Sequence, residues 1–154
     1  PLLAFILFAV TAATDFIDGY AARKLNAVSQ FGAFLDPIAD KLLVAAALLS
    51  LCYLADWRLL LLVPTISIIC RDLIVTILRL FPRLNLPVIS VAKWKTAAEM
   101  LGIGGLLLAP LVLPVQPQLS ALGLGLVWLA ALLSVWTGLR YTQSALSQMQ
   151  NDRA

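Results

Sequence analysis

Five long apolar stretches, separated by short polar segments, limit what this chain can fold into. They cover Pro1–Thr14, which continues into Asp15–Arg23, and then Pro37–Leu54, Leu59–Leu80, Ala97–Leu113 and Leu119–Tyr141. The stretches are rich in Leu and Ala and lack the period-2 alternation of strands, so each predicts a helix. A helix that crosses a bilayer needs about 20 apolar residues, and the chain has room for five crossings. The sequence therefore predicts an all-α, polytopic membrane helix bundle.

The composition excludes a water-soluble globule. Of the 154 residues, 62% are apolar and 12% charged, whereas soluble domains have about 45–50% and about 25%. The sequence has no histidine, which excludes His-based triads, His-ligated zinc and imidazole acid–base chemistry. Cys52 and Cys70 lie far apart in apolar runs and indicate neither a disulfide framework nor a metal cluster. The net charge of +3 is small for nucleic-acid binding and is better explained by anionic lipid headgroups.

The basic residues predict an orientation, because cytoplasmic loops of membrane proteins carry an excess of Lys and Arg. If residues 23–30 face the cytoplasm, nine of the eleven basic residues fall on that side. Arg58 falls on the far side and Arg71 within a helix. The nine are Arg23, Lys24, Lys41, Arg79, Arg83, Lys93, Lys95, Arg140 and Arg153. We therefore expect the carboxyl end in the cytoplasm and the residue-1 end outside.

The first apolar run is too short to cross a bilayer alone, since its 14 residues extend about 21 Å as a helix. It crosses only if the helix continues into the charged stretch that follows. No basic segment precedes it and no polar cleavage region follows it, so it does not resemble a signal peptide. We expect residues 1–154 to form a single transmembrane catalytic domain that lacks an upstream first helix.

Four aspartates lie where two of the apolar helices meet the cytoplasmic boundary. Asp15 and Asp18 are three residues apart, and Asp36 and Asp40 are four apart, so each pair shares a helix face. An Asp inside a transmembrane segment costs about 2.5–3.5 kcal/mol, and two such pairs on adjacent helices repel each other unless cations bridge them. Oxygen ligands without Cys or His favour Mg²⁺ or Mn²⁺, and two such ions suit phosphate chemistry.

Small and basic residues between the aspartates fit the same chemistry. Gly19 and Ala22 remove side-chain bulk beside the carboxylates, so that a ligand can approach the backbone closely. Arg23 offers a guanidinium suited to phosphate oxygens, and Gly32 opens space where the second helix begins. Pro37 is compatible with a helix if it lies in the first turn. The alternative interpretation is that the aspartates cap helices at the membrane interface and the glycines only let helices pack. It requires six spacings to coincide by chance.

The string D-x2-D-G-x2-A-R-x8-G-x3-D-x3-D, complete from Asp15 to Asp40, resembles the signature of the CDP-alcohol phosphatidyltransferase family. The resemblance implies an integral membrane enzyme with six core helices, usually a homodimer, that uses two divalent ions. Such an enzyme cleaves the pyrophosphate of a CDP-linked lipid, releases CMP and joins the phosphatidyl group to an alcohol. No part of this reaction follows from composition or spacing alone.

The same resemblance implies roles for the signature residues. Asp15, Asp18 and Asp36 would hold the metal that bridges the CDP pyrophosphate. Asp36 and Asp40 would serve the second ion, and Asp40 would be the catalytic base for the acceptor hydroxyl. The binding site for the nucleotide of the CDP-lipid would be lined by Gly19, Ala22, Arg23 and Gly32.

Further stretches resemble the bacterial members whose acceptor is sn-glycerol 3-phosphate and whose donor is CDP-diacylglycerol. These stretches are Phe31–Lys41, Arg71–Val75, Lys93–Met100 and Trp136–Ala145. The resemblance implies a role in phospholipid biosynthesis at the bacterial inner membrane, with the active site facing the cytoplasm. Those members usually have Arg-Glu where this chain has Arg71-Asp72. Because Arg-Asp also resembles eukaryotic-type cardiolipin synthases, phosphatidylglycerol stays open as the acceptor.

Basic residues outside the signature are candidates for binding the acceptor phosphate. Arg71 lies eight residues, about 12 Å, inside its helix, where a charge should face the bundle interior near an anion or carboxylate. We expect Arg71, Lys93 and Lys95 to bind the acceptor phosphate. The alternatives are a structural ion pair for Arg71 and a plain i, i+4 pair between Lys95 and Glu99. Asp72 is expected to point elsewhere on the helix and to orient a neighbour.

A small cation transporter is a hypothesis from a different class. The location of the carboxylates argues against it, since the four aspartates cluster at one interface and no charged residues line an exit toward the other side. Release of CMP from CDP-diacylglycerol discriminates the two classes, because a transporter releases none.

Overall fold

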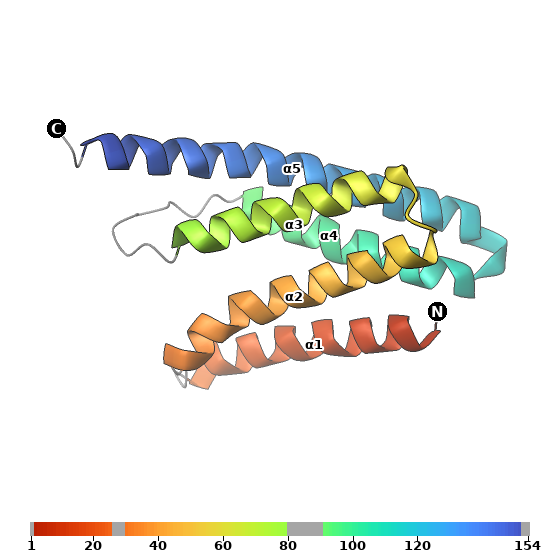
Figure 1. Cartoon of the computed structure of the whole chain (residues 1–154). Helices are drawn as coiled ribbons and strands as arrows, with labels where there is room; N and C mark the ends of the chain where they lie inside the picture. The colour runs from red at the N-terminus through yellow and green to blue at the C-terminus, as the bar shows by residue number, and fades with distance from the viewer. Residues whose placement is uncertain (1, 26–29, 80–90, 152–154) are drawn as a thin grey trace.

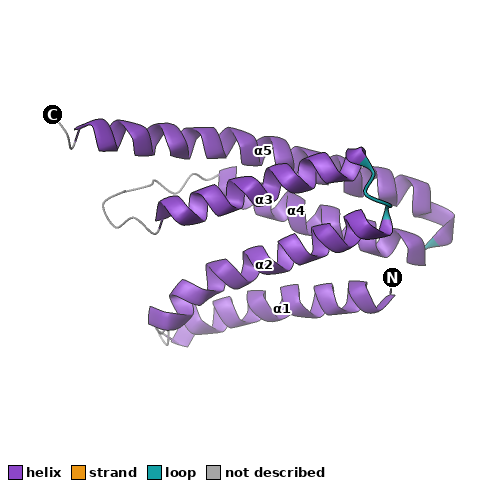
Figure 2. Cartoon of the chain, viewed as in Figure 1, coloured by secondary structure: helices purple, strands orange, loops and turns teal. Residues whose placement is uncertain are grey.

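In a computed structural model the described part of the chain is helical apart from short turns (Figure 2). The structure describes residues 2–25, 30–79 and 91–151. The helices are α1 (Leu2–Leu25), α2 (Gln30–Leu54), α3 (Leu59–Arg79), α4 (Val91–Leu108) and α5 (Gln116–Asn151), with two 3₁₀ turns, Ala109–Leu111 and Leu113–Val115, between α4 and α5. Because these ranges contain no strand, the predicted all-α class is confirmed.

The helices alternate in direction along one bundle (Figure 1). The carboxyl ends of α1, α3 and α5 lie at the same end of the bundle as the amino ends of α2 and α4. We call this the signature end, because the carboxyl end of α1 and the amino end of α2 carry the D-x2-D-G string. We call the opposite end, with residues 55–58, the turn end. Helix α4 packs against α5, α1 and α2, while α3 packs against α5 and α2. The alternation predicted for five consecutive helices is present.

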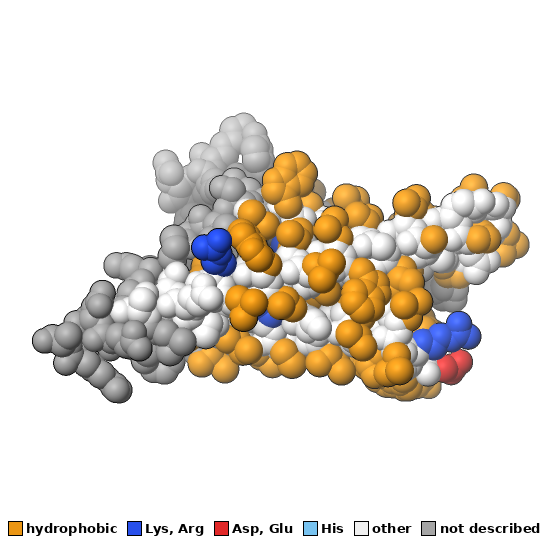
Figure 3. Space-filling view, turned by 90° about the horizontal axis from the view of Figure 1, so that it is seen from above, with side chains coloured by type: hydrophobic (Ala, Val, Ile, Leu, Met, Phe, Trp, Pro, Cys, Tyr) orange, Lys and Arg blue, Asp and Glu red, His pale blue; other side chains and the backbone are white. Residues whose placement is uncertain are grey.

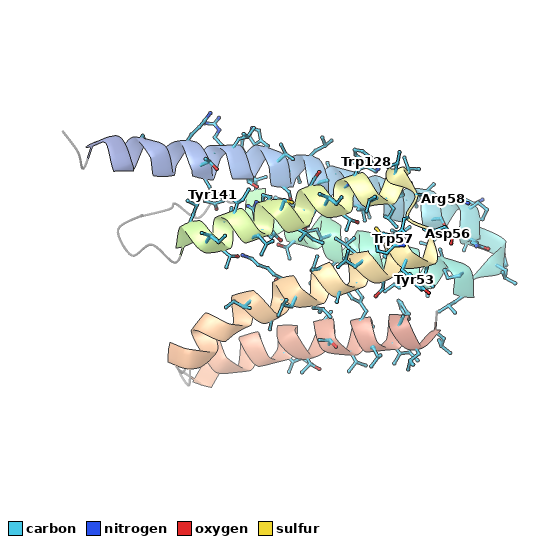
Figure 4. The ribbon with its side chains drawn as sticks, in the orientation of Figure 1. Tyr53, Asp56, Trp57, Arg58, Trp128 and Tyr141 are labelled. Carbon is cyan, nitrogen blue, oxygen red and sulfur yellow. The ribbon has the colours of Figure 1, made fainter. Side chains whose placement is uncertain are left out.

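The turn between α2 and α3 ends α2 in a Schellman arrangement. The backbone N–H of Trp57 donates to the carbonyl of Cys52 at 2.8 Å, and that of Asp56 donates to Tyr53 at 3.2 Å. Asp56 has φ 51° and Trp57 has φ 56°, in the left-handed region that Asp tolerates better than most residues. Tyr53, Asp56, Trp57 and Arg58 gather at the turn end (Figure 4). The predicted connection over residues 55–58 is confirmed.

Aliphatic side chains and glycines hold the turn half of the bundle together. Leu48, Ile103 and Val127 are completely buried. A Cβ on Gly102 would lie 3.0 Å from the carbonyl oxygen of Gly123, and a Cβ on Gly123 would lie 3.0 Å from that of Gly102. These two glycines therefore let the backbones of α4 and α5 approach closely.

Three helices begin earlier than the apolar stretches predict. Helix α2 begins at Gln30, so Pro37 is its eighth residue and not in the first turn; α4 begins at Val91 and α5 at Gln116. Helix α5 also continues to Asn151, beyond the end of its apolar stretch. Apolar runs mark where a helix is hydrophobic, whereas the backbone hydrogen bonds of a helix continue through polar residues at either end.

The surface of the described residues suits a membrane. Two segments, Leu59–Leu78 and Leu113–Ser144, are long and apolar enough to cross one, and Leu2–Thr14 is a shorter apolar helix. Large apolar side chains such as Leu59, Leu101 and Leu132 are well exposed. Figure 3 shows many apolar side chains over the described part of one face, with few charged ones in view.

Candidate active site

Four charged side chains from α3 and α4 meet inside the bundle. Arg71 Nη1 and Lys95 Nζ both donate to Asp72 Oδ1, at 2.8 and 2.7 Å. Lys95 Nζ also lies 2.8 Å from Glu99 Oε1. The four side chains are between 4% and 11% exposed. We call Arg71, Asp72, Lys95 and Glu99 the charged cluster. Its two cations and two carboxylates compensate one another, as buried charges must.

Helix α5 supports the Arg71 side chain of the charged cluster. Arg71 Nη2 donates to Thr137 Oγ1 at 2.9 Å, and the guanidinium carbon lies 5.6 Å from the centroid of the Tyr141 ring. A Cβ on Gly138 would lie 2.9 Å from Arg71 Cγ. Tyr141 lies between α5 and α3, away from the turn end (Figure 4). The guanidinium is therefore held by α3 on one side and by α5 on the other.

A cavity of about 180 Å³ opens beside the charged cluster. It brings Asp40 of the signature to the same space as Arg71 and Lys95, although the three residues come from α2, α3 and α4. The full lining is Asp40, Lys41, Val44, Arg71, Asp72, Val75, Lys95, Thr96, Glu99 and Tyr141. The charged groups of this lining are three carboxylates and three cations, of which Asp72 and Glu99 pair with Arg71 and Lys95. Such a cavity can bind an anionic group, and Asp40 can accept a proton from it.

Lys41 joins α2 to α3 beside this cavity. Its Nζ donates to Thr76 Oγ1 and to the carbonyl of Asp72, while Thr76 Oγ1 donates to the same carbonyl at 2.6 Å. Because Lys41 follows Asp40 directly, these contacts fix the α2 segment that carries Asp40 against α3. The position of Asp40 relative to the charged cluster is set in this way.

The chain matches the family model for CDP-alcohol phosphatidyltransferase over residues 1–136. It belongs to the CDP-alcohol phosphatidyltransferase family. A CDP-diacylglycerol–glycerol-3-phosphate 3-phosphatidyltransferase of Haemophilus influenzae is 36% identical over 150 residues, which cover 94% of this chain and 78% of that protein. The enzymes of that name from Escherichia coli and Shigella flexneri are 35% identical over 156 residues, covering 97% of this chain and 81% of each relative.

In this phosphatidyltransferase, the signature residues lie on two neighbouring helices at the signature end. Asp15, Asp18, Gly19, Ala22 and Arg23 are in the last three turns of α1, and Gly32, Asp36 and Asp40 are in the first three turns of α2. Helices α1 and α2 are in contact. The helical spacing of both aspartate pairs is therefore present. Apart from that of Asp40, the side chains of the signature residues, and that of Lys93, lie outside the described residues.

The donor atoms fit divalent metal ions by their chemistry. The signature supplies carboxylate oxygens from Asp15, Asp18, Asp36 and Asp40 without Cys or His, the ligand type that Mg²⁺ and Mn²⁺ prefer. Among the side chains that the structure describes, no group of three His, Cys, Asp or Glu residues could hold a metal. Three of the four aspartate side chains are not among them, so the predicted metal site stays a prediction.

For the charged cluster one expectation is confirmed, one is wrong, and the ion pairs considered as alternatives are present. Arg71 does face the interior next to a carboxylate, in an ion pair with Asp72, and Lys95 forms the i, i+4 pair with Glu99. Asp72 does not point away from Arg71, because the arginine side chain is long enough to fold back and bond to its neighbour. Asp72 does orient neighbours, since it holds both Arg71 and Lys95. Binding of the acceptor phosphate stays a prediction.

The sequence reasoning missed the residues of α5 that contact Arg71. Thr137 and Tyr141 are four residues apart and Gly138 and Tyr141 are three apart, so each pair shares a face of α5. The available signal was a buried arginine in α3, which requires an acceptor on another helix, and a threonine and a glycine among the apolar residues of α5. That signal indicates the need for a partner but not which helix provides it.

Proposed function

We propose that this chain transfers the phosphatidyl group of CDP-diacylglycerol to sn-glycerol 3-phosphate and releases phosphatidylglycerophosphate and CMP. The observation that carries the proposal is the cavity in which Asp40 of the family signature meets the buried cations Arg71 and Lys95. The relatives support it, because the names of the Haemophilus influenzae and Escherichia coli enzymes, which are 36% and 35% identical to this chain, specify this donor and this acceptor.

The donor half of the site lies on α1 and α2. Asp15, Asp18, Asp36 and Asp40 would hold two divalent ions, Mg²⁺ or Mn²⁺, which when bound neutralise and polarise the oxygens of the CDP pyrophosphate. Gly19, Ala22 and Gly32 leave room for the nucleotide, and Arg23 pairs with a phosphate oxygen. Chelation of divalent ions is expected to stop turnover reversibly.

The acceptor half lies at the charged cluster. Arg71 and Lys95, with Lys93 at the amino end of α4, bind the phosphate of glycerol 3-phosphate through charge-assisted hydrogen bonds. Asp72 and Glu99 hold the two buried cations in place before the substrate arrives, so little reorganisation is needed. A small dianion of this kind suits a compact cavity whose lining includes Lys41, Arg71 and Lys95 beside three carboxylates, whereas phosphatidylglycerol carries one phosphate charge and two acyl chains.

Asp40 acts as the general base between the two halves. Its carboxylate takes the proton of the acceptor hydroxyl as that oxygen bonds to the lipid-side phosphorus of the donor. The bond between this phosphorus and the bridging oxygen breaks, and CMP leaves with the electron pair. General-base catalysis of this kind contributes typically 10²–10⁴-fold.

The setting of the site is a membrane. We propose that residues 1–154 form one multi-pass catalytic domain, with the signature end at the cytoplasmic face of a bacterial inner membrane. Figure 1 supports this orientation, because the helix ends nearest in sequence to most of the basic residues lie at the signature end. Arg58 lies at the turn end (Figure 4). A homodimer is expected from the family resemblance.

The test is product formation by the purified protein with CDP-diacylglycerol and either glycerol 3-phosphate, phosphatidylglycerol or no acceptor. We expect CMP and phosphatidylglycerophosphate with glycerol 3-phosphate, measured by chromatography and mass spectrometry. Product from phosphatidylglycerol alone would make the chain a cardiolipin synthase. If no CMP is released with any acceptor, the proposed enzymatic function is contradicted and the transporter hypothesis is favoured.

A further inference from the structure

Two of the three guanidinium nitrogens of Arg71 are already bonded to the protein. Nη1 donates to Asp72 and Nη2 to Thr137. The third nitrogen, Nε, is buried and has no hydrogen-bond partner within the described part of the chain. A buried donor without a partner destabilises the folded protein, and more so when it is charged. Arg71 also lines the cavity, and each Nη nitrogen has a second N–H besides the one it donates, so the guanidinium keeps donors for an anion that enters the cavity.

The backbone of α5 lies unusually close to the base of the same side chain. The Cβ that an alanine would add at Gly138 meets Arg71 Cγ at 2.9 Å. Cγ is near the backbone and not at the flexible end of the side chain, so the whole guanidinium must swing to make room. The Tyr141 ring, 5.6 Å from the guanidinium carbon, limits the space into which it can swing.

We infer that Thr137, Gly138 and Tyr141 of α5 are positioning residues that orient the Arg71 guanidinium at the cavity, where it binds the acceptor phosphate. This inference rests on the proposed function, because it requires glycerol 3-phosphate to be the acceptor. It adds α5 to a site whose signature lies on α1 and α2. Thr137 supplies a hydrogen-bond acceptor, Gly138 supplies the room, and Tyr141 supplies a π face.

The first test compares Gly138→Ala with Gly125→Ala, the same substitution on the same helix. A Cβ at Gly125 meets no atom within 4 Å, so this variant is the matched control. We expect Gly138→Ala to raise the KM for glycerol 3-phosphate by about tenfold, the loss of roughly one charge-assisted hydrogen bond. The KM for CDP-diacylglycerol should stay near that of Gly125→Ala.

The second test covers the case in which Gly138→Ala does not fold. Thr137→Val removes the acceptor for Arg71 Nη2 and should raise the same KM, whereas Thr137→Ser keeps a hydroxyl and should restore it. A merely structural role for Thr137 would change stability or both KM values and would not separate the two substrates.

The outcomes separate this inference from the proposed function. If Arg71→Ala raises the KM for glycerol 3-phosphate but neither Gly138→Ala nor Thr137→Val does, the positioning role of α5 is wrong and the function stands. If the wild-type protein makes no product from glycerol 3-phosphate, the function fails and the inference fails with it. The inference and the proposed function are both supported if Gly138→Ala and Thr137→Val raise the KM for glycerol 3-phosphate. In that case Gly125→Ala and Thr137→Ser should keep the wild-type KM.

Discussion

The two ends of the bundle are built from the same helices but held together in different ways. In the turn half, α4 and α5 meet through Gly102 and Gly123 and bury Ile103 and Val127 completely. In the signature half, α3 and α4 meet through the charged cluster, and α5 adds Thr137. Small residues are the usual means by which membrane helices pack closely, whereas buried charges are costly in that setting.

This difference assigns the halves different tasks. Packing of backbone and aliphatic groups stabilises the bundle without needing any ligand. Removing one partner of a buried ion pair costs about 3–5 kcal/mol, yet the intact pair adds little stability over well-packed apolar residues. A charged cluster beside a cavity is therefore better explained by function, and substitutions in the two halves should change different measurable quantities.

The largest effect is expected for the metal-ligating aspartates. Asp36→Asn and Asp15→Asn each remove a charged ligand, so turnover should fall below about a tenth of wild type while the protein still inserts and purifies. The control is Asp56→Asn, the same change at an exposed position of the turn end, which should leave turnover unchanged. If Asp36→Asn and Asp15→Asn both keep more than about a tenth of wild-type turnover, metal ligation by these residues is contradicted.

Asp40→Asn is expected to act on the rate and not on binding of the CDP-lipid. Loss of a general base should slow turnover by at least about 10²-fold, measured as CMP release, while the dissociation constant for CDP-diacylglycerol changes little. If nucleotide binding disappears together with turnover, Asp40 is chiefly a metal ligand and its assignment as base is wrong.

A smaller effect, on stability alone, is expected in the turn half. A Cβ at Gly102 would lie 2.9 Å from Val127 Cγ2 and 3.0 Å from backbone atoms of α5. Gly102→Ala should therefore lower the free energy of unfolding by about 1–3 kcal/mol, measured by denaturation in detergent. The matched control is Gly104→Ala, whose Cβ comes no closer than 3.9 Å to Phe8. If Gly102→Ala instead raises the KM for glycerol 3-phosphate without loss of stability, the turn half also contributes to acceptor binding and the two halves do not have different tasks.

Much of the fold could be predicted, because helices that cross a membrane must be long and apolar. The turn at residues 55–58 was predicted because a short polar segment interrupts two such runs. The starts of α2 and α4 were not, since Gln30 and Val91 begin helical turns whose amino-acid composition differs little from that of a loop.

The site could be predicted where its residues are local in sequence. Lys95 and Glu99 are one turn apart, and the depth of Arg71 in α3 implied an interior carboxylate. The bond from Arg71 to Thr137 joins residues 66 positions apart. Such a contact depends on how α3 and α5 pack, and no spacing within either helix encodes it.

The most direct test of this account measures the KM for glycerol 3-phosphate in Arg71→Ala and Arg58→Ala. Both variants lose one arginine, but Arg71 lines the cavity and Arg58 is exposed at the turn end. We predict a rise of about tenfold or more for Arg71→Ala, with little change in the KM for CDP-diacylglycerol, and no change for Arg58→Ala. Equal effects of Arg71→Ala on both substrates would show that Arg71 is a structural residue and would contradict an acceptor site in this cavity.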